Sequence, residues 1–448
     1  MLSRILAIVS ACFLTAACGG GGGGGGSSSA STSAPASSTP PVSTPVTVAP
    51  LTNFTTVTVD GGPAALSVGP NASTADNSPF VSVTICAPGS TTNCQTIDHV
   101  LLDTGSVGLR LVASVVNASL LAALPVQTSA ASNPVGECYG YVDGYVFGSV
   151  RQADFQIGGE TVAGMPLQLI GDTGVFSTVP QSCSSGGGMN LNTVQTFGAN
   201  GVIGVGLTAT DCGGFCATSG GSGAATYYDC PSTGCSTIIA RASSTTAPFQ
   251  QLPNPVAAMS VDNNGTIIVL PAAPAGGEAS MTGTVYFGIG TQTNNTLGSA
   301  TVLTTTTSTS NLGSGLLTVI YNGQTLSESF LDSGTNFYVF VDNSITACTS
   351  KDLLGYYCPS PAQPLSPTVR GLSGNTASAA FTLNNAQSLV NTGFAVLPGI
   401  GGNPDLFNNL TPVPNSFGLG LPFFYGKSVY TAIEGRNAGG TVGPYFAY

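Results

Sequence analysis

Apolar and polar positions alternate in short segments over most of the chain after about residue 80. The stretch PFVSVTICAPGSTTNCQTIDHVLLDTGS (79–106) predicts a strand, a turn and a second strand. The stretch YGYVDGYVFGSVRQADFQIGGETVAGMPLQLIG (139–171) predicts a hairpin and further strands, with glycines where turns are expected. No long segment has the 3.6-residue period of an amphipathic helix, so the pattern predicts an all-β fold.

Two apolar segments carry the same interruption. In HVLLDTGSVGLRL (99–111) and SESFLDSGTNFYVF (327–340), an apolar run ends at Asp103 and Asp332, respectively. A hydroxyl residue, a glycine and a second hydroxyl residue follow each Asp, and then the apolar residues resume. The apolar runs are typical of buried strands, and the glycine permits a sharp turn that presents the Asp side chain.

The order of elements around these turns also repeats. An apolar–Gly element follows 101 residues after the first Asp, at Gly204, and 88 residues after the second, at Gly420. The repeat predicts an N-terminal lobe over residues 51–254 and a C-terminal lobe over residues 255–448. A polar, Gly- and Cys-rich stretch at about 211–249 is expected to be a surface insertion in the first lobe.

One turn from each lobe could bring Asp103 and Asp332 together. Two carboxylates in contact cannot both ionise, so one keeps a proton and the other can act as a base at mildly acidic pH. That chemistry suits the activation of a water molecule. A third DTG at 172–174 follows Ile-Gly instead of an uninterrupted strand, and only 32 residues separate Asp172 from Gly204. We interpret it as a surface turn.

The double motif resembles the pepsin-like aspartic proteases, and the likeness extends from about Phe80 to the end of the chain. NGVIGVG (200–206) is similar to the element that closes the first lobe's active-site loop in that family, and GTVYFGIG to the strand that opens the second lobe. The resemblance implies an all-β, bilobal double-barrel fold with an active cleft between the lobes. It also implies an aspartic endopeptidase acting on polypeptides without a cofactor or metal.

The resemblance assigns roles to the residues beside the dyad. Thr104 and Ser333 would hydrogen-bond across the lobe junction, and Gly105 and Gly334 would form the two turns. A second pair, Ser106 and Thr335, would each donate a hydrogen bond to the neighbouring carboxylate. Such bonds favour the ionised form and would keep the pKa values of the dyad low.

The family also covers its cleft with a hairpin flap that bears a tyrosine. Placing Gly144 and Gly148 on the flap glycines makes Tyr141 the flap residue, whereas the Tyr139-Gly140 dipeptide supports another register. A tyrosine in a hairpin is also commonly a half-buried strand residue. The chain departs from the family in lacking tryptophan, in the longer gap between the two Asp residues, and in the Cys-rich insertion.

The N-terminus has the features of a targeting segment. One arginine precedes a short apolar stretch, and FLTAAC resembles the lipobox of bacterial lipoproteins, in which Cys18 becomes lipidated. A plain secretory signal is the alternative, and the stretch is too short for a membrane span. Residues 1–18 are thus expected to be a signal peptide and residues 19–50, rich in Gly, Ser, Thr and Pro, a tether. The predicted location is the bacterial cell envelope, with attachment to the membrane through lipid.

Cysteine content agrees with an oxidising compartment. Ten of the 12 cysteines lie beyond the signal, and most fall as near neighbours, which predicts local disulfides whose pairing stays open. The alternative is a zinc site, because the four cysteines at 212, 216, 230 and 235 have finger-like spacing.

Composition restricts the remaining possibilities. Only 6% of residues are charged and the net charge is −11, so nucleic acid is not an expected partner. The single histidine, His99, lies in the strand before the first Asp and is expected to be a strand-edge residue, outside any Ser-His-Asp mechanism. We expect a monomer. Two alternatives to the protease stay open: a scaffold that binds a peptide or an envelope component without cutting it, and a structural β-rich surface protein.

Overall fold

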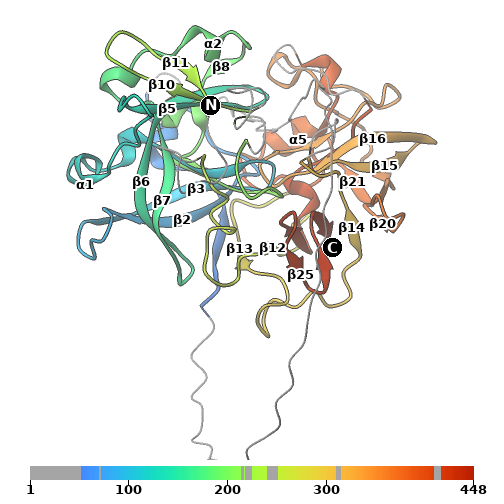
Figure 1. Ribbon diagram of the computed structural model, residues 1–448. Coiled ribbons are helices and arrows are strands. Elements are labelled where there is room, and N and C mark those ends of the chain that lie inside the picture. The colour runs from blue at the N-terminus through green and yellow to red at the C-terminus, as the bar shows by residue number, and fades with distance from the viewer. Residues whose placement is uncertain are drawn as a thin grey trace, which may run out of the picture.

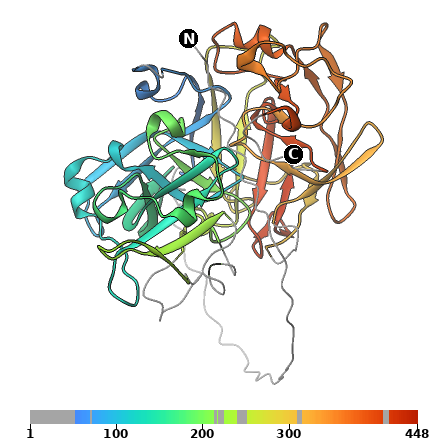
Figure 2. The same cartoon turned by 90° about the horizontal axis from the view of Figure 1, so that it is seen from above.

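The computed structural model describes residues 52–69, 72–212, 216, 224–239, 251–308, 314–407 and 415–448. The predicted signal peptide, the tether and Cys18 lie outside these residues. The first half of the chain, blue to green, and the second half, orange to red, form two lobes that stand side by side (Figure 1). Seen from above, the yellow and dark red strands run between the two halves (Figure 2).

A large mixed sheet of 16 strands forms the first lobe and continues through the junction between the lobes. In order across the sheet its strands are β11 (Ser236–Ile238), β10 (Ala225–Asp229), β5 (Val135–Gly140), β6 (Gly144–Ile157), β7 (Glu160–Ile170), β4 (Val107–Val112), β9 (Gly201–Val205), β3 (Cys94–Asp103), β2 (Pro79–Cys86), β1 (Phe54–Val59), β13 (Met281–Phe287), β12 (Gly265–Leu270), β24 (Lys427–Ala432), β27 (Tyr445–Ala447) and β14 (Val302–Thr304), and β8 (Met189–Asn190) pairs with β6.

The second lobe contains a sheet of seven strands. Their order is β20 (Thr376–Ser378), β19 (Thr368–Arg370), β15 (Leu317–Tyr321), β16 (Gln324–Leu331), β23 (Gly418–Leu419), β17 (Tyr338–Val339) and β22 (Gly401–Gly402). Two small pairs complete the described strands, β18 (Gln363–Leu365) with β21 (Phe381–Leu383) and β25 (Asn437–Ala438) with β26 (Thr441–Val442).

The described helices are short and connect strands. The α-helices are α1 (Ala118–Ala123), α2 (Gln181–Ser184), α3 (Val194–Phe197) and α5 (Ala386–Val390). The 3₁₀ turns are η1 (Ala64–Ser67), η2 (Ala113–Val115), η3 (Gly174–Phe176), η4 (Lys351–Leu353), η5 (Pro404–Leu406) and η6 (Leu421–Phe423). Within the described ranges, no helix has the length and apolar character needed to cross a membrane. The predicted all-β, bilobal fold is confirmed.

One hydrophobic core cluster extends through both lobes. It includes Leu102 and Leu331, the residues immediately before the two Asp residues, and both are almost completely buried. In the second lobe, Phe340 and Phe417 stack with ring centroids 4.6 Å apart in the same cluster. Burial of the residues before each turn anchors the ends of β3 and β16, and thereby the Asp residues that follow.

Part of the predicted insertion is built into the main sheet. β10 pairs with β5 in antiparallel fashion over Ala225–Asp229, and Tyr227 and Tyr228 are fully buried. This segment is therefore not a peripheral surface loop, because its aromatic side chains belong to the core. The polar composition of this stretch did not predict the strands β10 and β11. The partner strand of β10 is β5, which is about 90 residues away in the sequence, so no local pattern indicates the pairing.

Candidate functional site

Each predicted Asp stands at the end of a strand that has a parallel neighbour. β3 ends at Asp103 and pairs in parallel with β9, so that Asp103 lies opposite Gly204. Asp332 directly follows β16, which pairs in parallel with β23, with Leu331 opposite Leu419. The two apolar–Gly elements singled out in the sequence are therefore the strands that lie beside the two turns.

The structure brings the two turns into contact. A Cβ added to Gly105 would lie 2.6 Å from Cγ of Asp332, and a Cβ added to Gly334 would lie 2.6 Å from Oδ1 of Asp103. Each glycine thus lies against the carboxyl group of the other lobe. A side-chain carbon does not come this close to a neighbouring atom unless something shifts, so glycine is the residue that fits at both positions without displacing the carboxyl group.

Both carboxyl groups receive the same pair of hydrogen bonds. The hydroxyl of Ser106 donates to Oδ2 of Asp103, and the hydroxyl of Thr335 donates to Oδ2 of Asp332 over 2.7 Å. In each turn the amide of the glycine donates to Oδ1, at 2.7 Å for Asp103 and 2.8 Å for Asp332. The two sites are therefore near-copies, and all four donors favour ionised carboxylates.

The residues between the Asp and the Gly join the two lobes. The amide of Thr104 donates to Oγ of Ser333 over 3.1 Å, and the amide of Ser333 donates to Oγ1 of Thr104 over 2.9 Å. The Ser333 hydroxyl also donates to the carbonyl of Leu102 over 2.7 Å. These buried bonds cross the junction in both directions, and they fix the separation of the two turns.

Electrostatics favours retention of a proton between the two carboxyl groups. Asp103 is fully buried and Asp332 is 2% exposed. Burial, followed by the negative charge of Asp103, raises the pKa of Asp332 well above its usual range, and the donors Thr335 and Gly334 oppose this rise. The Asp103 carboxyl group adds to the rise as a hydrogen-bond partner as well as a charge. The hydroxyl and amide donors were expected to keep the pKa values low, but for Asp332 burial outweighs them.

A second set of bonds holds the lobes together near the dyad. Asn77, just before β2, donates through Nδ2 to the carbonyls of Asn336 at 2.8 Å and Leu397 at 2.9 Å. Its Oδ1 accepts from the hydroxyl of Tyr425 at 2.6 Å. Asn336, the residue after Thr335, donates in turn to the carbonyl of Asp76 at 2.6 Å. The two asparagines interlock the start of the first lobe with the turn of the second.

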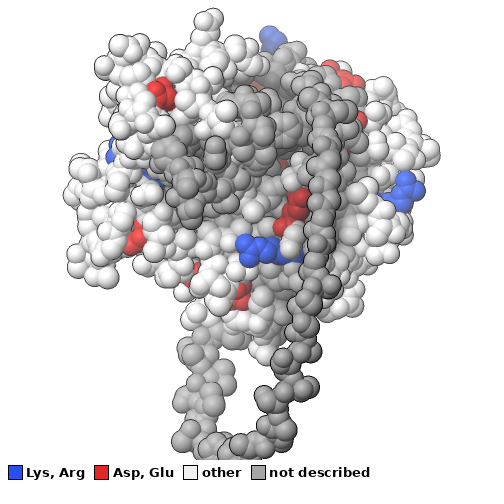
Figure 3. Space-filling view, viewed as in Figure 1, with Lys and Arg blue, Asp and Glu red and all other residues white. Residues whose placement is uncertain are grey.

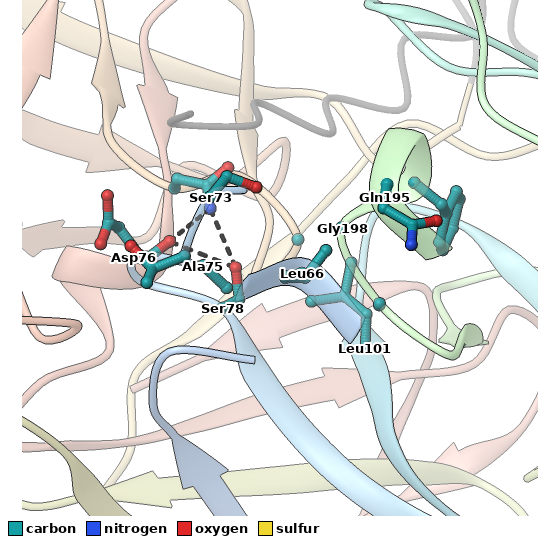
Figure 4. Close-up of a pocket in the computed structure, with 13 residues that line it drawn as sticks. Leu66, Ser73, Ala75, Asp76, Ser78, Leu101, Gln195 and Gly198 are labelled. Carbon is teal, nitrogen blue, oxygen red and sulfur yellow. Dashed lines mark hydrogen bonds between the residues drawn. The ribbon is translucent and has the colours of Figure 1, made fainter. Parts of the chain in front are cut away.

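A small cavity lies beside these asparagines (Figure 4). Its volume is about 20 Å³, and Gly334 and Asn336 line it together with Asp76, Leu101 and Phe197. A cavity of this size has room for an ordered water molecule but not for a large side chain. The wall next to the dyad turn is therefore closely packed on this side.

The segment predicted to be the flap forms a hairpin. β5 pairs with β6, and the amide of Tyr141 donates to the carbonyl of Gly144 over 2.7 Å at the tip. Tyr141 is 8% exposed, packs against Tyr139 and Phe197, and has a hydroxyl without a hydrogen-bond partner among the described residues. That hydroxyl oxygen is itself buried. Its role as a flap tyrosine stays a prediction.

Five disulfides are present among the described cysteines. They join residues 86 and 94, 138 and 183, 212 and 216, 230 and 235, and 348 and 358. The zinc alternative is wrong, because all four of its cysteines are paired with each other. In the described part of the chain, no group of three or more His, Cys, Asp or Glu side chains could hold a metal. The Cys138–Cys183 bond ties the hairpin strand β5 to α2.

The DTG at 172–174 turns at the surface, where Thr173 and Gly174 are exposed, but Asp172 itself is buried. Asp172 is 4% exposed, and its Oδ2 accepts from Arg151 Nη2 at 2.8 Å and from the hydroxyl of Ser149 at 2.5 Å. The ion pair lies between β6 and the end of β7. The sequence did not reveal it because the arginine is 21 residues upstream on the neighbouring strand. The side chains of Arg151 and Ser149 both belong to β6, so the pair fixes the end of β7 against β6.

His99 makes its charge contacts away from the two Asp turns. Its Nε2 lies 3.4 Å from Oδ1 of Asp60, and its Nδ1 lies 3.3 Å from Oδ1 of Asp98. The hydrogen bond with Asp60 raises the pKa of His99, and partial burial opposes the rise. The side chain is 25% exposed, and its partners are carboxylates and no nucleophile. It braces β3 against the end of β1.

Sequence reasoning missed two groups beside the site. The interlocking Asn77 and Asn336 gave no signal beyond the position of Asn336 directly after DSGT. A buried ionic cluster of Arg110, Glu137 and Asp211 was also missed, although a lone arginine in the apolar strand VGLRLV was a usable signal. A charge in the middle of a buried strand requires a buried partner.

Comparisons with known proteins give two findings. The family described as "Protein of unknown function (DUF3443)" matches residues 49–448. Among solved structures, the chain is similar to an aspartic proteinase from Irpex lacteus, with 14% identity and a TM-score of 0.47, over 88% of this chain and 96% of that one. No curated protein matches.

Proposed function

This chain belongs to the DUF3443 family, and we propose that it is an aspartic endopeptidase whose dyad is Asp103 and Asp332. One observation carries the proposal: two buried carboxyl groups, one from each lobe, lie against each other's turns and are each oriented by a hydroxyl and an amide. A turn with a purely structural role gains no stability from two like charges in contact in the protein interior. Such pairs are costly unless they share a proton, and a shared proton supports acid–base chemistry.

The proposed mechanism uses the pair as one acid and one base. The ionised carboxylate takes a proton from a water molecule, whose oxygen attacks the peptide carbonyl carbon. The protonated carboxyl group donates a hydrogen bond to the carbonyl oxygen and stabilises the tetrahedral intermediate. The C–N bond then breaks as the nitrogen receives a proton from the dyad. No covalent intermediate with the chain forms, and the proton count of the pair is restored.

The fixed geometry supports such a mechanism. The bonds between Thr104 and Ser333 hold the two carboxyl groups at one separation, so little reorganisation is needed at the moment of attack. The same scaffold could also bind a peptide without cutting it, and the pH–rate profile below distinguishes the two functions, since a binding protein gives no rate.

Replacing Thr335 by Ala should shift the alkaline limb of the pH–rate profile to higher pH. The Thr335 hydroxyl lowers the pKa of Asp332, so its removal lets burial and the Asp103 charge raise that pKa further. The one-proton state then persists to higher pH, because this state is lost as pH rises through the upper pKa of the pair. The measurement is kcat/KM against pH on a single peptide for both proteins.

A matched control is Thr431→Ala. Thr431 is equally buried, but its hydroxyl lacks a hydrogen-bond partner among the described residues. Its profile should coincide with that of the wild type. A Thr335→Ala profile that stays in place or moves toward acid would mean that this hydroxyl does not tune the dyad.

The proposal extends to location. Five disulfides agree with an oxidising compartment, and the FLTAAC segment supports lipidation at Cys18. Charged side chains are sparse on the face in Figure 3, so a purely electrostatic attachment to a membrane has little support. We expect a monomer that is held at the bacterial envelope by its lipid and acts on polypeptides.

Cys18→Ser should release the protein from the membrane fraction or block its processing. Lipid attachment needs the thiol of Cys18, and a serine cannot replace it in a thioether. The readout is the distribution between soluble and membrane fractions together with the mass of the mature N-terminus. A processed Cys18→Ser protein that stays in the membrane fraction would contradict lipid anchoring.

A further inference from the structure

A fully buried arginine lies at the base of the β5–β6 hairpin. Arg110 is in β4, the strand that follows the first Asp turn, and its side chain has no exposed surface. Its Nη2 donates to Oε1 of Glu137 at 2.6 Å and to Oδ2 of Asp211 at 2.9 Å, and both carboxylate side chains are equally buried. Its Nη1 donates to the carbonyl of Val107 at 2.8 Å.

The cluster connects several segments of the first lobe. Asp211 also accepts from the hydroxyl of Tyr227 in β10 at 2.9 Å, and that hydroxyl accepts from the amide of Leu252 at 2.7 Å. Gln168 in β7 donates to the carbonyl of Glu137 at 2.6 Å. Because a buried charge that loses its partner is strongly destabilising, these segments are held in one arrangement.

The same arginine contacts the tyrosines of the hairpin. Its guanidinium carbon is 3.7 Å from the ring centroid of Tyr139, and the rings of Tyr139 and Tyr141 are 5.0 Å apart. Burial raises the pKa of Tyr141 well above its usual range, the charge of Arg110 opposes the rise, and the charges of Tyr139 and Asp103 add to it. Tyr141 is thus close enough to both the cluster and the catalytic turn to be influenced by each.

We propose that Arg110 is a positioning residue, which is held by Glu137 and Asp211 and fixes Tyr139, and through it Tyr141, relative to Asp103. The proposal rests on the proposed function, because it concerns access to the same dyad. Arg110 touches neither carboxyl group of the dyad in the described contacts, so it acts through the hairpin. A cation stacked on an aromatic face restrains the ring by attraction as well as by packing.

The restraint that the cluster places on Tyr139 and Tyr141 depends on pH, because the cluster contains titratable groups. One guanidinium faces two carboxylates, Glu137 from β5 and Asp211 from the segment after β9, and the phenols of Tyr139, Tyr141 and Tyr227 complete the charged and titratable surroundings. Burial, and then the charge of Glu137, raise the pKa of Asp211 well above its usual range, although Arg110 and Tyr227 oppose the rise. Burial of the cluster thus favours the protonated form of Asp211 in the folded protein.

The sign of the stability effect follows from that proton. The folded-state pKa of Asp211 is above the unfolded value of about 3.9, so folding favours the protonated form. This contribution to stability is fully present below the unfolded pKa and is lost as pH rises through the folded pKa. The contribution of Asp211 to the stability of the cluster, and thus to the restraint on the hairpin, is expected to be greatest at acidic pH.

The test compares Arg110→Lys with Arg151→Lys. Lysine keeps the positive charge but lacks the planar guanidinium group that donates to both carboxylates. Among the described residues of this lobe, Arg151 also has a buried carboxylate partner, Asp172, and its hydrogen bonds go to Asp172, Ser149 and the carbonyls of α1 and its C-cap. We measure kcat and KM on one peptide, and backbone hydrogen exchange over residues 135–146.

In Arg110→Lys, kcat should fall by about tenfold or more with a smaller change in KM, because a displaced group costs turnover. Exchange over residues 135–146 should be faster, whereas Arg151→Lys should leave both quantities within about twofold of the wild type. Equal effects of the two variants, or an unchanged exchange rate in Arg110→Lys, would overturn the proposal. If the wild type cleaves no peptide, the proposed function fails, and the exchange rates alone still decide the role of Arg110.

Asp211→Asn keeps the proposal falsifiable if Arg110→Lys does not fold. Asparagine resembles the protonated carboxyl group, so the Tm of this variant should fall less than that of the wild type as pH rises above the unfolded pKa of about 3.9. Asp229→Asn is the control, since Asp229 is the last residue of β10 and accepts hydrogen bonds from Ser129 and Asn133. If the Tm of Asp211→Asn follows the wild-type pH dependence, the proposed pH dependence of the hairpin support is overturned.

Discussion

Replacing Asp332 by Asn should reduce kcat/KM at least about a thousandfold, because an amide can neither hold the shared proton nor serve as the base. The amide retains the shape of the side chain and can still accept the hydrogen bond from Thr335 at Asp332 Oδ2. The turn should therefore stay intact while the chemistry is lost. Circular dichroism and Tm would establish that the fold is unchanged, and the peptidase assay would give the rate.

Asp103→Asn should have the same effect, since the two carboxyl groups work as one unit and neither suffices alone. Asp172→Asn is the matched control. It also removes a buried carboxylate from a DTG sequence, but its partners are Arg151 and Ser149 and not the dyad. That variant should lose stability and keep its rate within a factor of a few at a temperature where it is folded. Activity of Asp332→Asn close to that of the wild type would end the protease assignment.

Gly334→Ala should lower kcat/KM by roughly a hundredfold, since displacements of about 1 Å in the reacting groups have effects of this size. The added methyl group would lie 2.6 Å from Oδ1 and 2.9 Å from Cγ of Asp103. The backbone at Gly334 does not require glycine, because its φ is not in the left-handed region. The effect is therefore purely steric: the methyl group separates the two carboxyl groups.

Two other glycines make the comparison specific. Gly105→Ala should behave in the same way, because its methyl group would lie 2.6 Å from Cγ of Asp332. Gly276→Ala serves as the control, since no heavy atom lies within 4 Å of the added methyl group. Near-wild-type kinetics in Gly334→Ala would mean that the two turns do not meet as closely as the structure indicates.

Local patterns in the sequence predicted the fold class and the two turns. The apolar runs before Asp103 and Asp332 and the glycines after them define a strand and a turn within about ten residues. The elements at Gly204 and Gly420 could be found because the order of segments repeats, and the structure pairs them in parallel with β3 and beside the end of β16. Periodicity and turn chemistry are properties of neighbouring residues, so they can be read without the fold.

Long-range partners could not be predicted in this way. The DTG at 172–174 was interpreted as a surface turn, and the burial of Asp172 was missed because its cation is on another strand. The stretch that contains β10 was interpreted as a surface insertion because its partner strand, β5, is distant in the sequence. Arg110 donates to Asp211, which is 101 residues away. Burial and ion pairing of this kind are decided by strand order, which the sequence alone left open. The register of the hairpin tyrosines stayed open for the same reason.

The most direct test of the central claim is digestion of an unbiased peptide mixture by the tether-free protein, from pH 3 to 8, with and without pepstatin. The account predicts new peptide termini that require both Asp103 and Asp332, disappear with pepstatin, and follow a bell-shaped pH dependence. The Asp103→Asn/Asp332→Asn double variant, prepared in parallel, identifies any contaminating peptidase. No cleavage at any pH by the folded wild type, or cleavage that the double variant retains, would contradict the account.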